Sequence, residues 1–204
     1  MGLGLPSGGG GDFITYLKFN AKAGRWYTKN DDGDEYEVKP GFSAIFDLEN
    51  IRTGYMKFAA GMAPDFVYDS TAGGMDADQP DDKYKRGFTV NVFSPKALGG
   101  VREISSTAGV FNNAMNQLYG EYEAGLADNA GNLPVVQVQD ATPVESKHGT
   151  NYAPVLKLIK WAARPDDLPD DTPKAAPKAA PKAAPKAAAP EPAIADAGGD
   201  DEYF

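Results

Sequence analysis

One segment of the chain repeats apolar residues at helical spacing, over residues 108–126, and it comes late in the sequence. Val110, Phe111, Met115 and Leu118 fall on one face of that helix, and Thr107 is placed to cap it. The rest of the folded region consists of short runs rich in β-branched and aromatic residues, which predict strands. These runs cover 13–19, 25–29, 35–39, 42–51, 55–58, 66–68, 88–93, 101–106, 135–138 and 152–161.

Because no helices alternate with these strands, the pattern argues against a parallel βαβ sheet and predicts a mainly β protein. We expect an OB-fold-like antiparallel barrel with one inserted helix over residues 12–165. A β-sandwich is the alternative. The aromatic residues that we expect most often in the core are Phe42, Phe46, Phe58 and Phe111.

The last part of the chain has a composition that cannot build a core. The unit PKAA recurs from Pro173, Pro177, Pro181 and Pro185, and a proline at every fourth position prevents a helix. We therefore expect a semi-stiff, extended linker over residues 166–190 and a disordered acidic tip over 191–204. Residues 1–11 are glycine-rich, which predicts a flexible N-terminal arm.

The charge is unevenly divided between the body and the tail. The chain has a formal net charge of −9, with 16 basic and 20 acidic side chains in residues 1–165, and 4 basic and 9 acidic ones in residues 166–204. A mildly acidic body argues against a histone-like coat on DNA. A locally basic groove is still compatible with this net charge, because DNA binding depends on the local cluster of cations and not on the net charge of the whole protein.

The residues available for catalysis are few. The chain has no cysteine and a single histidine, His148, so it has no disulfides, no thiolate zinc site and little material for a histidine relay. We therefore expect a protein that is not an enzyme and holds no cofactor or metal. A carboxylate-only, metal-dependent nuclease is the weakest alternative. The sequence has no signal peptide and no long apolar run, which predicts a cytoplasmic protein.

Several short stretches combine aromatic rings with cations, as single-stranded nucleic acid binding requires. Bases stack on aromatic faces while Lys and Arg guide the backbone. The densest such stretch is residues 83–88, KYKRGF, and alternation allows only one of Trp26 and Tyr27 to face outward. The predicted DNA-binding residues are Arg25, Trp26, Tyr27, Tyr55, Lys57, Lys83, Tyr84, Lys85, Arg86, Phe88, Lys147 and Tyr152.

The tip ends in three acidic residues and two aromatics: Asp200, Asp201, Glu202, Tyr203 and Phe204. It resembles the C-terminal tip of bacterial and phage single-stranded-DNA-binding proteins, an acidic disordered segment that ends in Phe and docks replication and repair partners. Tyr203 stands where the bacterial family usually has Pro, which favours a phage-encoded relative. Residues 147–165 are also similar to the body-to-tail junction of the phage proteins, so the resemblance covers about the last third of the chain.

The resemblance implies a non-catalytic, sequence-nonspecific single-stranded-DNA-binding protein of phage DNA replication or recombination, in the cytoplasm of an infected bacterial cell. Its partners would be single-stranded DNA and, through the tip, a polymerase, helicase or nuclease; the tip would also compete for the DNA groove. The alternative is a protein-interaction module that binds no nucleic acid. The two differ in whether Lys83, Lys85 and Arg86 share a face with Arg25 and Lys57.

Overall fold

The computed structural model describes residues 14–59, 62–145, 147 and 149–169. Its strands are β1 (Leu17–Asn20), β2 (Arg25–Lys29), β3 (Glu35–Val38), β4 (Ser43–Phe46), β5 (Arg52–Lys57), β6 (Asp65–Tyr68), β7 (Lys85–Ser94), β8 (Gly100–Ser106), β9 (Asn132–Val144) and β10 (Asn151–Ala163). The 3₁₀ helix η1 (Leu48–Asn50) lies between β4 and β5, and the α-helix α1 (Gly109–Gly125) lies between β8 and β9.

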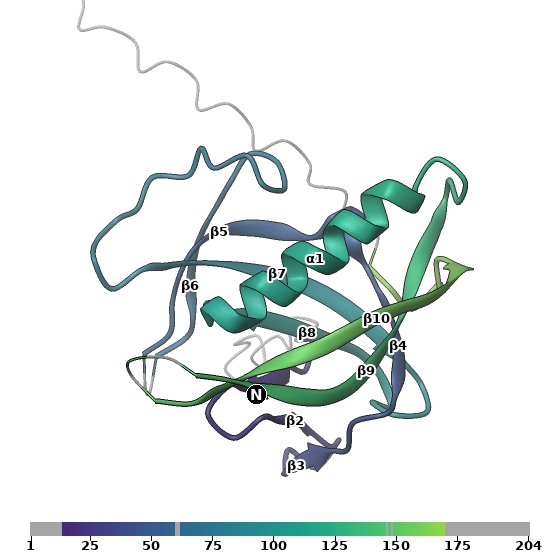
Figure 1. Ribbon diagram of the computed structural model, residues 1–204, viewed down its shortest axis with the longest axis horizontal. Coiled ribbons are helices and arrows are strands. Elements are labelled where there is room, and N and C mark those ends of the chain that lie inside the picture. The colour runs from purple at the N-terminus through teal and green to yellow at the C-terminus, as the bar shows by residue number, and fades with distance from the viewer. Residues whose placement is uncertain (1–13, 60–61, 146, 148, 170–204) are drawn as a thin grey trace, which may run out of the picture. The chain divides into compact units, whose positions relative to one another are not determined.

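The strands form two antiparallel sheets (Figure 1). The larger sheet has seven strands in the order β10-β9-β4-β7-β5-β6, with β8 paired to the other edge of β7. The smaller sheet is β1-β2-β3, and a single bridge from Tyr16 to Glu103 joins its first strand to β8. α1 runs diagonally across one face of the large sheet and packs mainly on β10.

The core is centred on one aromatic side chain of the helix. The Phe111 ring meets Phe19, Trp26 and Phe88 edge-on, with ring centroids 5.6, 5.4 and 5.1 Å away. Such pairs contribute about 0.5–1.5 kcal/mol each beyond their burial. The helix therefore ties the small sheet and the large sheet into one core.

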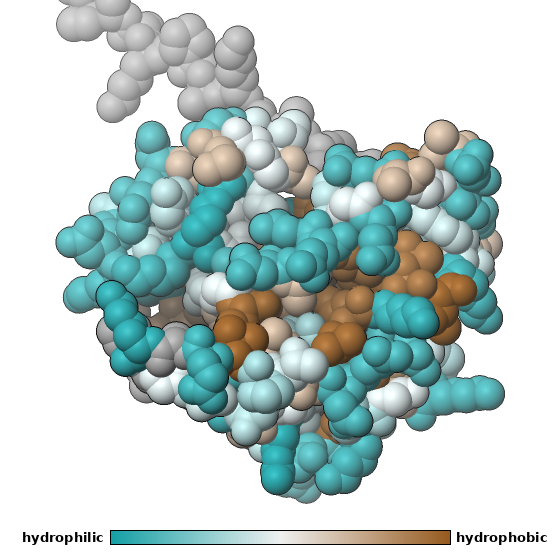
Figure 2. All heavy atoms as spheres, viewed as in Figure 1, coloured by the Kyte–Doolittle hydropathy of each residue, from teal (hydrophilic) through white to brown (hydrophobic). Residues whose placement is uncertain are grey.

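The far end of α1 closes on the last strand. Tyr122 stacks on Trp161 of β10 with ring centroids 5.6 Å apart, and a Cβ atom at Gly125 would lie 2.6 Å from the Trp161 ring. Only glycine therefore allows this close approach of helix and strand. Figure 2 shows hydrophobic residues gathered in a band between α1 and β10.

A buried ion pair holds the end of the body in place. Arg164, just after β10, donates hydrogen bonds of 2.6 and 2.9 Å to Asp47 and one of 2.9 Å to Glu49. The Asp47 side chain is only 1% exposed. Leu168 is buried as well, so the packed body continues past Pro165.

The expected architecture is confirmed at the level of a mainly β protein with antiparallel sheets and, among the described residues, a single α-helix. The expected closed barrel is not formed in this part of the chain, because the order of pairing runs from β10 to β6 and no pair joins its ends. The predicted cap is also wrong: Ala108 is the residue before the helix, and it makes no side-chain cap. No helix in the described part is both long and apolar enough to cross a membrane.

Candidate nucleic-acid interface

Trp26 is a core residue, so the prediction that it stacks on bases is wrong. Its side chain is 2% exposed and lies between Phe19, Phe42 and Phe111. Strand alternation then directs Tyr27 and Arg25 to the outer face of the small sheet. Arg25 is exposed there and donates to Glu37 at 3.1 Å.

Two more predicted aromatic contacts lie inside the protein. Phe88 is 3% exposed and packs on Phe111, so it belongs to the core rather than to a DNA surface. Tyr84 is 7% exposed; its hydroxyl donates to Asp65, and the Lys57 ammonium lies 5.1 Å from its ring centroid. Neither ring has a free face on which a base could stack.

Arg86 is neutralised within the protein. It donates two hydrogen bonds to Asp69, one of them 2.8 Å long, and Asp69 also accepts hydrogen bonds from the Thr53 hydroxyl and the Ala77 N–H. Burial alone would raise the pKa of Asp69, but these hydrogen bonds outweigh it and lower that pKa to about 2. The carboxylate is therefore charged at all physiological pH values and holds Arg86 in place.

The loop at residues 69–82 supplies further carboxylate and carbonyl partners for the predicted cations. Lys57 lies 3.6 Å from the Asp81 carboxylate, and Lys85 donates to the Asp82 carbonyl at 2.8 Å. Lys83 is exposed, and its backbone N–H donates to Asp81 at 2.7 Å. The loop folds back over β5 and β7 through these contacts.

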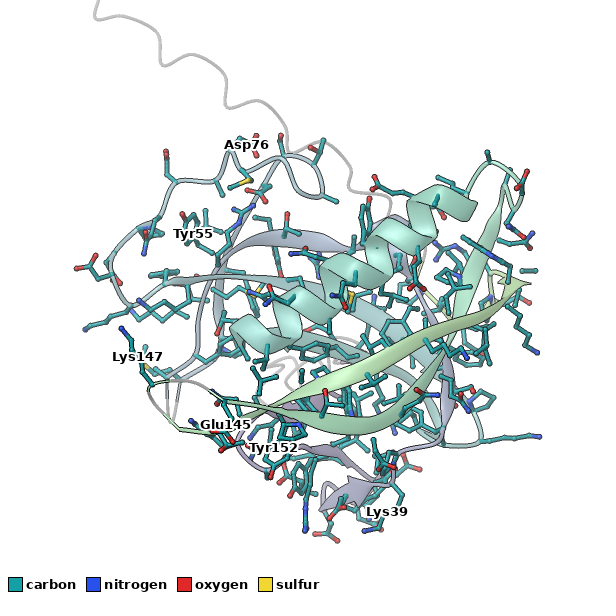
Figure 3. All side chains as sticks on the ribbon, in the orientation of Figure 1. Lys39, Tyr55, Asp76, Glu145, Lys147 and Tyr152 are labelled. Atoms are coloured by element: carbon teal, nitrogen blue, oxygen red, sulfur yellow. The ribbon has the colours of Figure 1, made fainter. Side chains whose placement is uncertain are left out.

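Lys147 lies in the turn between β9 and β10, and Tyr152 is the second residue of β10. Figure 3 shows both on the β9–β10 hairpin. Lys147 is exposed, whereas the half-buried Tyr152 packs against the core, with its ring 2.9 Å from where a Gly24 Cβ would be. The predicted partner-binding residues Asp200, Asp201, Glu202, Tyr203 and Phe204 lie outside the described residues.

The predicted cations do not share one face. Strand alternation places Lys57 and Arg86 on the face of β5 and β7 that carries α1, and Lys85 on the opposite face. Arg25 is in the other sheet. The structure thus brings together Tyr55 and Arg86, 5.5 Å from ring centroid to guanidinium, but does not assemble the predicted set into one groove.

A different group of residues forms an aromatic surface, which we call the β5–β6 aromatic cluster: Arg52, Phe58, Phe66 and Tyr68. The Arg52 guanidinium lies 4.5 Å from the Tyr68 ring centroid, Tyr68 stacks on Phe66 at 5.5 Å and 11°, and Phe58 meets Phe66 edge-on at 6.0 Å. Phe58, which we expected in the core, is 48% exposed. The cluster is a row of three rings with a cation at one end.

Close packing of the two strands aligns this row. A Cβ atom at Gly54 would lie 2.2 Å from the Val67 carbonyl oxygen, so only glycine lets β5 and β6 approach so closely. The Tyr68 hydroxyl lies 3.4 Å from the Thr89 hydroxyl, which in turn lies 2.9 Å from that of Ser105. A line of hydroxyls thus leads from the cluster onto the same face of β7 and β8.

Behind this hairpin, on the opposite face of the sheet, is a cavity of about 380 Å³ between α1 and the loop at residues 69–82. Met75, Met115, Phe88 and Arg86 are among its lining residues. Met75 has a φ of 55°, a left-handed conformation that is rare for a residue with a side chain. The cavity adjoins the Arg86–Asp69 pair.

Sequence reasoning missed the cluster because its members come from two strands and a turn. Part of this arrangement was visible in the sequence. Side chains alternate along a strand, so Arg52 and Phe58 lie on one face, and so do Phe66 and Tyr68. Only the register of the β5–β6 pair places all four on the same face. A comparison of the chain with family models, curated proteins and solved structures finds no match.

Proposed function

We propose that this protein binds single-stranded DNA without sequence preference and without catalysis, and that it serves phage DNA replication or recombination. The observation that carries the proposal is the β5–β6 aromatic cluster. Stacking of a base on an aromatic side chain contributes about 1–3 kcal/mol and tolerates any base, since every base has a flat face. Arg52, with its side chain 41% exposed and 3.8 Å from the Glu103 carboxylate, adds a partly paired cation beside the rings for a phosphate or a base.

The order of strand pairing supports a derived OB-fold. Taken together, β4 and β5 serve as one bent first strand, followed by β7, β8, β9 and β10, with α1 between the third and fourth. The pairs β4–β7, β7–β8, β4–β9 and β9–β10 are those of such a barrel. An OB-fold is often partly open, and here the pair that would join β8 to β10 is the one not formed among the described strands.

The small N-terminal sheet lies across that opening. On the β8 side, the Glu103 N–H donates to the Thr15 carbonyl at 2.9 Å; on the β10 side, the Tyr152 N–H donates to the Ala21 carbonyl at 2.7 Å. The added sheet thus supplies hydrogen-bond partners at both margins. This arrangement supports a barrel in which an inserted element replaces one strand pair.

The position of the cluster also fits the proposal. OB-folds bind oligonucleotides on the face of their second and third strands and through the loops after the first and fourth strands. In this assignment the β6 hairpin belongs to the first of those loops, and Lys147 belongs to the second. Thr89 and Ser105 then lie on the strand face beside the cluster.

The tail completes the proposed function. We assign to Asp200–Phe204 the recruitment of a replication protein such as a polymerase, helicase or nuclease, on the strength of its acidic, aromatic-ended sequence. The same negative charge would compete with DNA phosphates for cations on the body. Removal of residues 191–204 should therefore strengthen DNA binding and abolish partner binding.

One observation favours the second candidate, a protein-interaction module that binds no nucleic acid. Arg25, Lys57 and Arg86 each have a carboxylate partner in the structure, so these predicted phosphate contacts are already paired. Exposed apolar rings such as Phe58 also serve protein interfaces.

Fluorescence anisotropy of a labelled oligo-dT with the full-length chain, at low and moderate salt, distinguishes DNA binding from the protein-interaction module. The proposal predicts binding that weakens as salt rises, because phosphate contacts release counterions, and a clear preference over duplex DNA of the same length. Absence of binding to oligo-dT at low salt would reject the DNA function and leave the interaction module.

A further inference from the structure

Among the described residues, no strand pairs with the outer edge of β6, so backbone hydrogen-bonding groups are open there. The Asp69 N–H donates to the Thr53 carbonyl at 2.9 Å, which fixes the alternation of the β5–β6 ladder. Val67 then bonds to β5, whereas the N–H and C=O groups of Phe66 and Tyr68 point away from it. Within the described chain, β6 pairs with β5 alone.

The other edges of the two sheets are protected in ways that β6 is not. β10 carries Lys157 and Lys160 and two register irregularities, and β3 carries Glu35 and Glu37. The edge of β8 is covered by the bridge to the N-terminal segment. Charges and bulges of this kind prevent edge-to-edge pairing. In contrast, β6 reads DFVY, with one charge at its first residue and no proline, lysine or bulge.

We propose that two copies of this chain pair through β6, antiparallel and related by a twofold axis at Val67. An antiparallel pair of identical strands is self-complementary, as a twofold interface must be. In this register Phe66 of one copy lies opposite Tyr68 of the other, and both have free backbone groups pointing outward. The interface therefore uses all four unpaired N–H and C=O groups of each strand at once.

The acidic residues at the ends of β6 do not oppose this pairing. The Asp69 side chain is fully buried and bonded to Arg86, and Asp65 accepts a hydrogen bond from the Tyr84 hydroxyl of its own chain. Both lie on the face opposite the aromatic rings. The exposed apolar surface at this edge, with Phe58 48% exposed, favours burial against a second copy.

The dimer does not depend on the proposed DNA function, since it rests on the free edge alone. If both hold, pairing would bring the β5–β6 aromatic clusters of two copies side by side on one continuous sheet. The stacking surface would then be doubled and continuous between subunits, which would make DNA binding cooperative.

A single introduced cysteine tests the pairing directly, because the chain has none of its own. Val67→Cys places one thiol opposite its twin in a non-hydrogen-bonded antiparallel pair, where the Cα atoms lie about 4.5 Å apart and a disulfide can form. Mild oxidation of the full-length variant, without DNA, should give a covalent dimer on non-reducing gels. The control is Lys96→Cys, at an exposed turn away from β6, which should stay monomeric under the same conditions.

A pair of substitutions tests the backbone hydrogen bonds. Phe66→Pro removes the outward N–H and the ring, while Phe66→Ala removes only the ring; proline is tolerated at an edge where the N–H faces outward. Sedimentation equilibrium should show dimers for the native chain and for Phe66→Ala, and a dimer dissociation constant about tenfold or more higher for Phe66→Pro. The proposal is overturned if Val67→Cys cross-links no faster than Lys96→Cys, or if the native chain stays a monomer at high micromolar concentration.

Discussion

Arg86 donates two hydrogen bonds to Asp69, and the carboxylate that accepts them has no exposed surface. The most cation-rich stretch of the body is thus bound to its own acidic loop. Arg86 orders the residues between β6 and β7 instead of presenting a free charge. The aromatic surface of the β5–β6 hairpin, on the opposite face of the same sheet, is the better candidate for nucleic acid.

The Arg86–Asp69 pair predicts a specific pH dependence. The pKa of Asp69 is lowered from 3.8 to about 2, so the folded state favours the charged form. Its contribution, about 2 kcal/mol, is full above pH 4 and is lost as pH falls through about 2. Denaturant titrations from neutral to acid pH should show that Asp69→Asn is less stable at pH 7 but loses less stability below pH 4. Asp128→Asn, at an exposed position, should keep the native profile; equal profiles for both variants would contradict this role.

We predict that Arg164 contributes more to the stability of the protein than the exposed cations do. Arg164→Ala leaves the Asp47 carboxylate buried without its partner, which costs about 3–5 kcal/mol. Lys39→Ala breaks an ion pair in which the lysine is 80% exposed and should change the free energy of unfolding by less than about 0.5 kcal/mol. Urea denaturation of both variants measures the difference, and similar small losses would show that Arg164 does not hold the end of the body.

Two glycines of α1 should respond oppositely to alanine. Nothing lies within 4 Å of a Cβ atom at Gly120, so Gly120→Ala should stabilise the protein by about 0.5–1 kcal/mol. The Cβ at Gly125 would strike the Trp161 ring, so Gly125→Ala should destabilise it by about 1–3 kcal/mol despite better helix propensity. Thermal denaturation followed by circular dichroism gives the sign of each change; stabilisation by both would mean that the helix does not pack so closely on β10.

Neighbouring residues of β2 should differ sharply in their effect on stability. Trp26→Ala empties the centre of the aromatic core and should cost about 3–5 kcal/mol. Tyr27 lies on the outer face of the sheet, so Tyr27→Ala should cost less than about 1 kcal/mol. Guanidinium denaturation of the two variants provides the comparison, and the reverse order would mean that the small sheet presents its other face to Phe111.

The aromatic cluster predicts which substitution weakens DNA binding without unfolding the protein. Phe58→Ala removes an exposed ring, so it should weaken oligo-dT binding by about 5- to 150-fold with little change in melting temperature. Tyr36→Ala, at an aromatic 39% exposed in the small sheet, is the matched control and should bind as the native chain does. Anisotropy titrations decide this, and equal affinities for both variants would remove Phe58 from the interface.

The sequence predicted the fold class well because local patterns determine it. The helical spacing of residues 108–126 and the β-prone runs around it are visible without tertiary information, and α1 spans Gly109–Gly125 as expected. Alternation on β2 showed that only one of Trp26 and Tyr27 faces outward. Which of the two does so depends on Phe111, more than eighty residues later in the chain, and no local pattern carries that information.

The candidate site was harder to predict for the same reason. Residues 83–88 look like a free basic patch, because nothing local shows that Asp69 and Asp81 fold back onto Arg86 and Lys57. Phe58 looks like a core residue, because nothing local shows that β5 and β6 extend beyond the helix as a hairpin. Both errors concern long-range pairing, which the register of the strands settles.

Ultraviolet cross-linking of oligo-dT to the full-length protein, with the linked peptides identified by mass spectrometry, would show directly which residues contact the bases. Thymine links readily to aromatic side chains on which it stacks. Binding through the β5–β6 aromatic cluster predicts linked residues between Arg52 and Tyr68, with Phe58 and Phe66 foremost. Links confined to the small sheet or to α1, with none in the β5–β6 hairpin, would contradict it.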